Sequence, residues 1–262
     1  MTSTGQPAYQ FGDSLQAAQR LRLLAAVFEP STREFLTQMP RDHVRHVVDL
    51  GCGPGCTTRL LANVFPNSEV SGLDSSPHFV ELAREASDDR ITFAVADVTQ
   101  TLLGGPYNLA YCRYLLTHLA DPWAALDLWS QSLADRGLLA IEENEWIRTT
   151  QPSFARYLEI VTAMLADSGQ RLYVGGELDA VGARGNLVKR SSVLTPVSVS
   201  DHQTARMFLP NLDNWRTRPY VQRNVSATEL DELRSRLVQL AEDSSGVCST
   251  TFGLRQLVFQ RT

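Results

Sequence analysis

The stretch Val47-Val48-Asp49-Leu50-Gly51-Cys52-Gly53-Pro54-Gly55 decides the fold of this chain. It begins with two β-branched residues and a leucine around one aspartate, a composition typical of a buried strand. Three glycines follow, and glycine permits both a positive φ and a close approach of the backbone to a ligand. Residues 56–65 then read as a helix. Because a helix N-terminus presents N–H groups without helical partners, this order of elements predicts a nucleotide-type site.

Length, composition and charge limit the possible functions. The chain has 262 residues, of which 43% are hydrophobic, and its net charge is -5. At roughly 100–200 residues per domain, this is one large domain or two small ones. An acidic balance gives no electrostatic reason to expect a nucleic-acid partner. We also see no run of ~18 apolar residues that could span a membrane, and no signal-peptide pattern at the start.

The cysteines indicate the cellular compartment and bear on a possible metal site. The four cysteines are few and scattered, which suits a reducing cytoplasm. Cys52 and Cys56 form a close pair, but no second Cys or His pair lies at a spacing typical of a zinc site, so we expect no metal. We therefore expect a cytoplasmic protein, a monomer or homodimer, that acts on a small molecule and binds neither nucleic acid nor a membrane.

Strands and helices alternate five times through the first half of the chain. The predicted strands cover residues 44–50, 69–73, 91–95, 107–112 and 137–142, with helices between them. This alternation argues for an α/β fold, with a parallel sheet covered by helices on both faces. Ahead of the first strand we predict one helix over 15–28, ended by Pro30, and a second that starts at a capping box of Ser31 and Glu34.

The pattern changes after residue 145. We predict helices over 152–166, 176–183 and 204–209, a β-rich stretch over 188–199, a helix capped by Ser226 and a final strand over 252–260. The predicted domain organisation is an N-terminal helical cap (1–40), a core (41–145), a mostly helical lid insertion (146–215) and a C-terminal helix and strand that complete the core (216–262).

Three aspartates lie at or just past the ends of predicted strands. Asp49 is within the first strand, Asp74 follows the second and Asp97 follows the third. Ligands of open α/β sheets bind outside the carboxyl ends of the strands. Asp74 comes 23 residues after Gly51, where a carboxylate can accept hydrogen bonds from ribose hydroxyls. Asp97 is placed to meet the edge of an adenine.

Two classes of adenosine-containing ligand remain at this point. A dinucleotide site would show Gly-x-Gly-x-x-Gly, but here the third glycine is one position early and Pro54 lies inside the turn. The alternative is S-adenosyl-L-methionine (SAM), which has no pyrophosphate to bind.

Five segments in order resemble motifs of class I SAM-dependent methyltransferases. The segment 47–55 resembles the first motif, 72–76 the ribose-binding acidic loop and 94–98 the adenine-contacting segment. The segments 114–122 and 137–141 are similar to those of the UbiE-like branch, which methylates small molecules. The resemblance covers about residues 40–145, with weaker similarity around Tyr9, Arg20 and Tyr173.

The resemblance implies a Rossmann-like, seven-stranded, mostly parallel sheet with the last strand antiparallel. It implies SAM as cofactor, S-adenosyl-L-homocysteine as product, and an in-line transfer of the methyl group to an O, N or C nucleophile of a small metabolite. A SAM-binding protein of the cyclase or regulatory type on the same fold is the alternative. The residues that the resemblance assigns to SAM binding are Gly51, Cys52, Gly53, Gly55, Asp49, Asp74, Ser75, Asp97, Val98, Arg113, Tyr9 and Arg20.

Candidates for catalysis follow the fourth strand. His118 could deprotonate an acceptor or serve as a structural histidine. Arg113 could bind a carboxylate or make an ion pair, and Tyr114 could line the pocket or pack in the core.

Candidates for substrate binding follow the fifth strand. Glu143 and Trp146 belong to a stretch that could hold a cationic amine through charge and cation–π attraction, or could be a solvated turn. Tyr173 is a further candidate substrate contact, because it lies in one of the segments with weaker similarity to the family.

Overall fold

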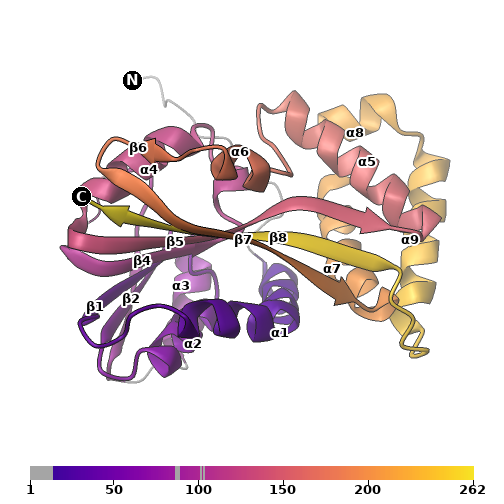
Figure 1. Cartoon of the computed structure of the whole chain (residues 1–262). Coiled ribbons are helices and arrows are strands. Elements are labelled where there is room, and N and C mark those ends of the chain that lie inside the picture. The colour runs from indigo at the N-terminus through magenta and orange to yellow at the C-terminus, as the bar shows by residue number, and fades with distance from the viewer. Residues whose placement is uncertain (1–13, 86–88, 101, 103) are drawn as a thin grey trace, which may run out of the picture.

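A computed structural model describes residues 14–85, 89–100, 102 and 104–262, and Tyr9 therefore lies outside the described residues. Its centre is an eight-stranded sheet (Figure 1). The strands are β1 (His46–Leu50), β2 (Glu69–Asp74), β3 (Ile91–Val95), β4 (Tyr107–Arg113), β5 (Leu133–Thr149), β6 (Ala183–Arg184), β7 (Leu187–Val199) and β8 (Thr250–Arg261).

The strand order in the sheet is β3-β2-β1-β4-β5-β8-β7-β6. Strands β1 to β5 pair in parallel, and β8 is antiparallel to both β5 and β7. It follows that β7 runs in the direction of the first five strands. The prediction of a mostly parallel sheet with an antiparallel last strand is confirmed, and the two-residue β6 at the edge is an eighth strand that was not predicted.

Helices cover both faces of the sheet. In Figure 1, α1 (Leu15–Thr37), α2 (Cys56–Val64) and α3 (Pro77–Arg84) lie on one face, and α4 (Pro122–Gln131) and α6 (Gly175–Asp179) on the other. A second group gathers around the far ends of β5, β7 and β8. It contains α5 (Pro152–Asp167), α7 (Asp201–Trp215), α8 (Pro219–Asn224) and α9 (Ala227–Glu242).

The buried side chains divide along the same lines. One apolar cluster packs α1, α2 and α3 under the sheet, and another packs α4 and α6 above it. A third joins Phe28 of α1 to α5, α7, α8, α9 and the end of β8. Each face of the sheet therefore buries alternate residues of the same strands, which is why the strands read as nearly continuous hydrophobic runs. None of the described helices combines the length and the apolar character that crossing a bilayer needs.

Helix α1 corrects the prediction of two N-terminal helices. Pro30 lies inside α1, and the helix continues to Thr37. Proline removes one helical hydrogen bond, which costs about 3 kcal/mol in an exposed helix. Here Phe28, Thr32 and Leu36 on either side of it are fully buried, so tertiary packing holds the helix together across the proline. Ser31 therefore does not start a helix, whereas Ser14 is the N-cap of α1 and the predicted N-cap at Ser226 is confirmed.

Two elements in the second half are longer than predicted. Strand β5 runs on to Thr149 because β8 pairs with it from Leu138 as far as the pair Thr149 and Thr250. Helix α7 runs from Asp201 to Trp215 through Pro210, where the sequence predicted only residues 204–209. The segment predicted to be mostly helical also contains β7, which pairs with β8 in the sheet.

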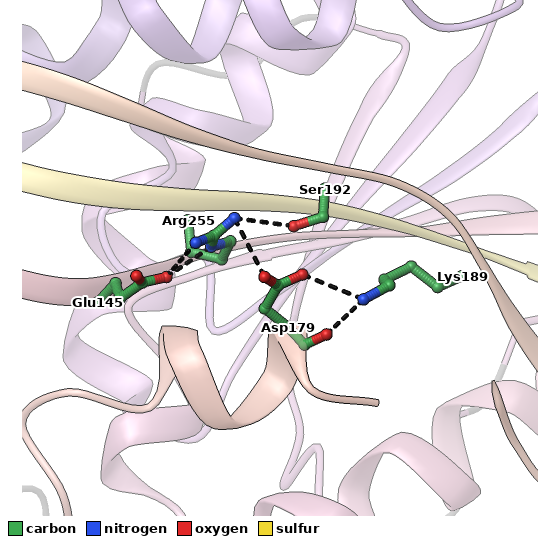
Figure 2. Close-up of polar contacts among 5 residues, drawn as sticks. All are labelled: Glu145, Asp179, Lys189, Ser192 and Arg255. Atoms are coloured by element: carbon green, nitrogen blue, oxygen red, sulfur yellow. Dashed lines mark hydrogen bonds and ion pairs between the residues drawn. The ribbon is translucent and has the colours of Figure 1, made fainter. Parts of the chain in front are cut away.

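A network of charges links four elements around Arg255 of β8 (Figure 2). The Arg255 guanidinium contacts the Glu145 carboxylate of β5 at 2.5 Å and the Asp179 carboxylate of α6 at 3.3 Å. It also donates to Ser192 Oγ of β7 at 3.0 Å. Lys189 of β7 pairs with the same Asp179 at 3.1 Å. The network holds the five-residue α6 against the sheet, although a helix of this length is not stable alone.

We expect Arg255→Met to lower the free energy of unfolding by about 1–3 kcal/mol, because it leaves two partly buried carboxylates without their shared cation. The Arg255 side chain is only 13% exposed, so water cannot fully replace the lost contacts. Urea denaturation of the full chain measures the change.

Arg156→Met is the matched control. Arg156 also bridges two carboxylates, those of Glu159 and Glu229, but its side chain is 42% exposed. We expect a loss below about 1 kcal/mol there. Equal losses in the two variants would contradict a stabilising role for the Arg255 network.

Candidate functional site

A cavity of about 520 Å³ opens beyond the carboxyl ends of β1, β2 and β4. This volume lies in the range of small-molecule sites, about 300–1,000 Å³. One half, which we call the turn half, is formed by the turn between β1 and α2 and by the residues just after β2 and β3. The other half, the helical wall, consists of the lining side chains from α1 beyond Leu21, from α5 and from α7, together with Asn144, Ile147, Leu172 and Phe252.

The glycine turn has the backbone shape that its sequence predicts. Gly51, Gly53 and Gly55 all have positive φ, at 69°, 52° and 77°. A Cβ at Gly51 would lie 2.9 Å from Leu115 Cδ1, and one at Gly55 would lie 2.7 Å from Phe93 Cζ. Both the backbone angle and the close neighbours therefore require glycine at these positions.

Asp49 holds the turn from behind. Its Oδ2 accepts hydrogen bonds from Thr57 Oγ1 at 2.6 Å and Thr58 Oγ1 at 2.7 Å, which ties the end of β1 to the first turn of α2. Burial raises the pKa of Asp49 to about 6, although these two hydroxyls act in the opposite direction. Asp49 is not among the cavity-lining residues. Asp49 would therefore affect a bound ligand indirectly, by fixing the shape of the glycine turn.

Asp74 joins the turn to the end of β2. Its Oδ2 accepts from Gly53 N at 2.8 Å, and its Oδ1 accepts from Ser76 N at 2.9 Å. The side chain lines the cavity beside Ser75 and across from Asp97 and Val98. Asp97 is itself fixed by the backbone N–H and hydroxyl of Thr99. The turn half thus presents two carboxylates with a set orientation.

The segment after β4 brings the three catalytic candidates to the cavity. Arg113, Tyr114 and His118 all line it. Tyr114 has φ of 54°, an uncommon conformation for a residue with a side chain, and its N–H donates to Glu142 O at 3.0 Å. Strain of this kind is often found at functional sites. The turn at Tyr114 directs the chain from the strand across the mouth of the cavity.

Arg113 lies at the end of β4. Its Nη1 donates to Thr32 Oγ1 of α1 at 2.9 Å. Burial opposes the charged form, but Tyr111 and Glu142 nearby raise the pKa of Arg113 above its usual value. The guanidinium therefore has neighbouring negative charge within the protein.

His118 is held neutral. Burial lowers the pKa of His118 to about 3, and the nearby Arg20 guanidinium acts in the same direction. At neutral pH its imidazole therefore carries no charge. Such a histidine can accept a hydrogen bond, but it is a weak base.

Two adjacent buried carboxyl groups support this segment from opposite sides of β5. Glu142 accepts from Tyr111 Oη at 2.5 Å and from Gln256 Nε2 at 2.7 Å. Glu143 Oε1 accepts from the backbone N–H groups of Leu115 at 2.8 Å and Leu116 at 2.7 Å. Burial raises the pKa of Glu143 to about 8 despite these backbone donors. Glu143 therefore fixes the turn that follows Tyr114.

The cavity brings together most of the residues that the sequence assigned to a site. The lining residues include Arg20, Gly51, Cys52, Gly53, Asp74, Ser75, Asp97, Val98, Arg113, Tyr114 and His118. Gly55, Glu143, Trp146 and Tyr173 are not among them. Trp146 instead packs against Gly253 and lies under the guanidinium of Arg148, 4.3 Å from the ring centroid. The predicted substrate contacts of Glu143, Trp146 and Tyr173 thus have no direct counterpart in the cavity.

Sequence reasoning missed the helical wall. Asn144, Asn211, Tyr157 and Phe208 line the cavity, although they come from β5, α7 and α5. Asn211 did carry a signal, because it is a polar residue between Phe208 and Leu212 on the buried side of a helix. Buried polar groups need a partner, so such a residue is a candidate for ligand contact.

The chemistry of the lining can be stated from these groups. Two carboxylates and a glycine turn in one half suit a ligand with hydroxyl and N–H donors, such as an adenosine. The other half is mainly apolar. Among the described residues, no group of three or more His, Cys, Asp or Glu side chains is arranged to hold a metal ion.

Comparison with known proteins identifies similar sequences over part of the chain. Residues 48–139 match the family model described as a methyltransferase domain. The chain is 39% identical over 109 residues to trans-aconitate 2-methyltransferase of Methylobacterium radiotolerans, and 36% identical over 110 residues to the protein of that name from Streptomyces avermitilis. The first match covers 42% of each chain and the second 40% of each, so this chain spans less than half the length of these relatives.

Solved structures share the fold over most of the chain. Coclaurine N-methyltransferase, bound to N-methylheliamine and S-adenosylhomocysteine, superposes with a TM-score of 0.56 at 17% identity, covering 91% of this chain and 72% of that one. The YcgJ protein of Bacillus subtilis superposes with a TM-score of 0.57 at 14% identity, covering 89% of this chain and 98% of that one. At such identities the similarity concerns the fold alone.

The raised pKa of Glu143 predicts a pH-dependent stability. In the unfolded chain a glutamate has a pKa of about 4.5, so between that pH and about 8 folding requires Glu143 to take up a proton. This contribution to stability is therefore present below about pH 4.5 and is lost as the pH rises to about 8. Glu143→Gln keeps an acceptor for the two N–H groups but does not titrate.

We expect the stability of Glu143→Gln minus that of the wild type to rise by a few kcal/mol between pH 5 and pH 9, since one pKa unit corresponds to about 1.4 kcal/mol. Denaturation of both proteins across this range measures the difference. The exposed Glu159→Gln serves as control and should show a constant difference. A constant difference for Glu143→Gln as well would mean that Glu143 is ionised in the folded protein.

Proposed function

We propose that this chain, which matches the methyltransferase-domain family model over residues 48–139, is a class I methyltransferase that transfers the methyl group of SAM to a nucleophile of a small organic molecule. The domain match agrees with the resemblance that the sequence indicates. The observation that carries the proposal is the turn half of the cavity, where the glycine turn, Asp74 and Asp97 converge beyond the carboxyl ends of the strands.

The residues of the turn half fit SAM by their chemistry. A carboxylate such as Asp74 can accept hydrogen bonds from both hydroxyls of a ribose. Gly51 and Gly53 line the cavity with backbone alone, and Asp97 with Val98 would meet the adenine. Arg20 and Arg113 are the candidates for the methionyl carboxylate. Tyr9, Gly55 and Asp49 remain proposed SAM residues, the last two through the shape of the turn.

When bound, SAM supplies a methyl group on a sulfonium, which is already a good leaving group. The contribution of the protein is then mainly to hold the two reactants in line and to exclude water. Tyr114 lines the cavity; its N–H donates to Glu142 O, and Glu143 holds the two residues that follow it. His118 is in the neutral form that a hydrogen-bond acceptor needs. Its low pKa argues against strong base catalysis.

The nature of the acceptor and the domain organisation are also parts of this proposal. The names of the curated relatives raise trans-aconitate as one candidate acceptor.

The helical wall supports the assignment of a cap to residues 1–40 and of a lid to residues 146–215, because α1, α5 and α7 all contribute lining residues. We also retain the cytoplasmic location and the monomer or homodimer as proposals.

The activity is tested by incubating the protein with SAM and a broad panel of small acceptors. We expect S-adenosyl-L-homocysteine and methylated product to form in equal amounts. Tight binding of SAM without release of S-adenosyl-L-homocysteine would favour the alternative of a SAM-binding protein that transfers no methyl group.

Asp74→Ala should weaken the binding of S-adenosyl-L-homocysteine by about 1–3 kcal/mol, the range for removing one partner of buried polar groups. The variant loses both the proposed ribose contact and the hydrogen bond that fixes Gly53. Isothermal titration calorimetry measures the affinity. Glu81→Ala, on the same side of the fold in α3, is the control and should bind as the wild type does. Unchanged affinity of Asp74→Ala would contradict its role.

A further inference from the structure

The helical wall presents a preformed aromatic surface. The Tyr157 and Phe208 rings stack with centroids 4.0 Å apart and an angle of 7° between their planes. Phe28 of the same wall meets Tyr114 and Phe252 edge to face, with centroids at 5.4 and 5.3 Å. Rings that already pack against one another need little rearrangement to receive a ligand. This surface suits a hydrophobic molecule.

Charge is confined to the other side of the cavity. The charged lining residues among those described are Asp74 and Asp97 in the turn half, Arg20 beside His118, and Arg113 at the end of β4. The helical wall contributes none. Arg113 already has the buried Glu142 as a neighbour and donates to Thr32. Burying a carboxylate without an opposite charge is costly, so the wall does not suit a molecule with several carboxylates.

Three neutral polar groups at the wall have no partner of their own. Tyr114 Oη, Asn144 Oδ1 and Asn211 Oδ1 are buried and make no hydrogen bond within the described part of the chain. All three residues line the cavity. A buried polar atom that stays unpaired costs about 1–3 kcal/mol, so each of them favours a ligand that brings a partner. Their uncharged amide and hydroxyl chemistry matches a hydroxyl group.

Most of the wall also lies outside the segment that matches the family model. Residues 48–139 match the methyltransferase domain, whereas Phe28, Asn144 and Asn211 fall before or after that segment. Similarity over the domain therefore carries no information about the surface that would meet the acceptor.

We propose that the methyl acceptor is an uncharged, mainly hydrophobic molecule with a hydroxyl group that hydrogen bonds to Asn211 of the helical wall. This inference rests on the proposed function, since it assigns the helical wall to the acceptor. The same argument disfavours a polycarboxylate such as trans-aconitate, which the names of the relatives raised as a candidate.

The test measures binding to the full chain saturated with S-adenosyl-L-homocysteine, with 2-naphthol as the neutral probe and trans-aconitate as the charged one. We expect 2-naphthol to bind at least about tenfold more tightly, a difference of about 1.4 kcal/mol. Equal affinity, or tighter binding of trans-aconitate, overturns the proposal. This comparison uses the wild-type protein and does not depend on the folding of any variant.

A variant at Asn211 tests whether 2-naphthol binds at the helical wall. Asn211→Leu keeps the size of the side chain but removes its polar atoms, and we expect it to weaken 2-naphthol about fivefold or more while S-adenosyl-L-homocysteine binds as before. Asn224→Leu, on the exposed part of α8, is the matched control. Unchanged 2-naphthol binding in Asn211→Leu overturns the assignment of the wall.

Failure of the two proposals can be told apart. If S-adenosyl-L-homocysteine binds and 2-naphthol does not, only the acceptor inference is wrong. If S-adenosyl-L-homocysteine itself does not bind to the wild type, the proposed function is wrong, and the acceptor inference falls with it.

Discussion

The hydrogen bond from Gly53 N to the Asp74 carboxylate holds the glycine turn against the end of β2, and the cavity depends on it. This hydrogen bond can form because Gly51, Gly53 and Gly55 take positive φ, and the resulting turn brings the Gly53 N–H to face the Asp74 carboxylate. Asp49 fixes the same turn from behind through Thr57 and Thr58. One half of the cavity is thus shaped by contacts between neighbouring parallel strands and the start of one helix.

The lining segment after β4 depends on buried carboxyl groups of β5. Glu142 and Glu143 follow each other along the strand and therefore point to opposite faces of the sheet. One supports Tyr111 and Gln256, and the other holds the backbone after Tyr114. The unusual φ of Tyr114 persists because both neighbours constrain it. The sequence marked Glu143 as a candidate substrate contact, and in the structure its carboxylate accepts from the backbone N–H groups of Leu115 and Leu116.

The errors of the sequence-based prediction share one cause. Pro30 and Pro210 read as helix breakers, yet both lie inside helices whose neighbouring residues are buried. Strand β5 extends to Thr149 because β8, more than a hundred residues later, pairs with it from Leu138 to that residue. Local propensities amount to a few kcal/mol at most, and packing against distant segments exceeds them. Such contacts cannot be read from a local window of sequence.

The sequence by itself determined the order of strands and helices in the first half, the glycine turn, and the placement of Asp74 and Asp97 at the carboxyl ends of their strands. These follow from short-range rules: hydrophobic runs make strands, glycines allow positive φ, and parallel strands end at one edge. Only the tertiary structure decided the helical wall. Phe28, Asn144, Tyr157 and Asn211 are far apart in the chain, and they line one cavity because α1, α5, α7 and β5 pack against a common apolar cluster.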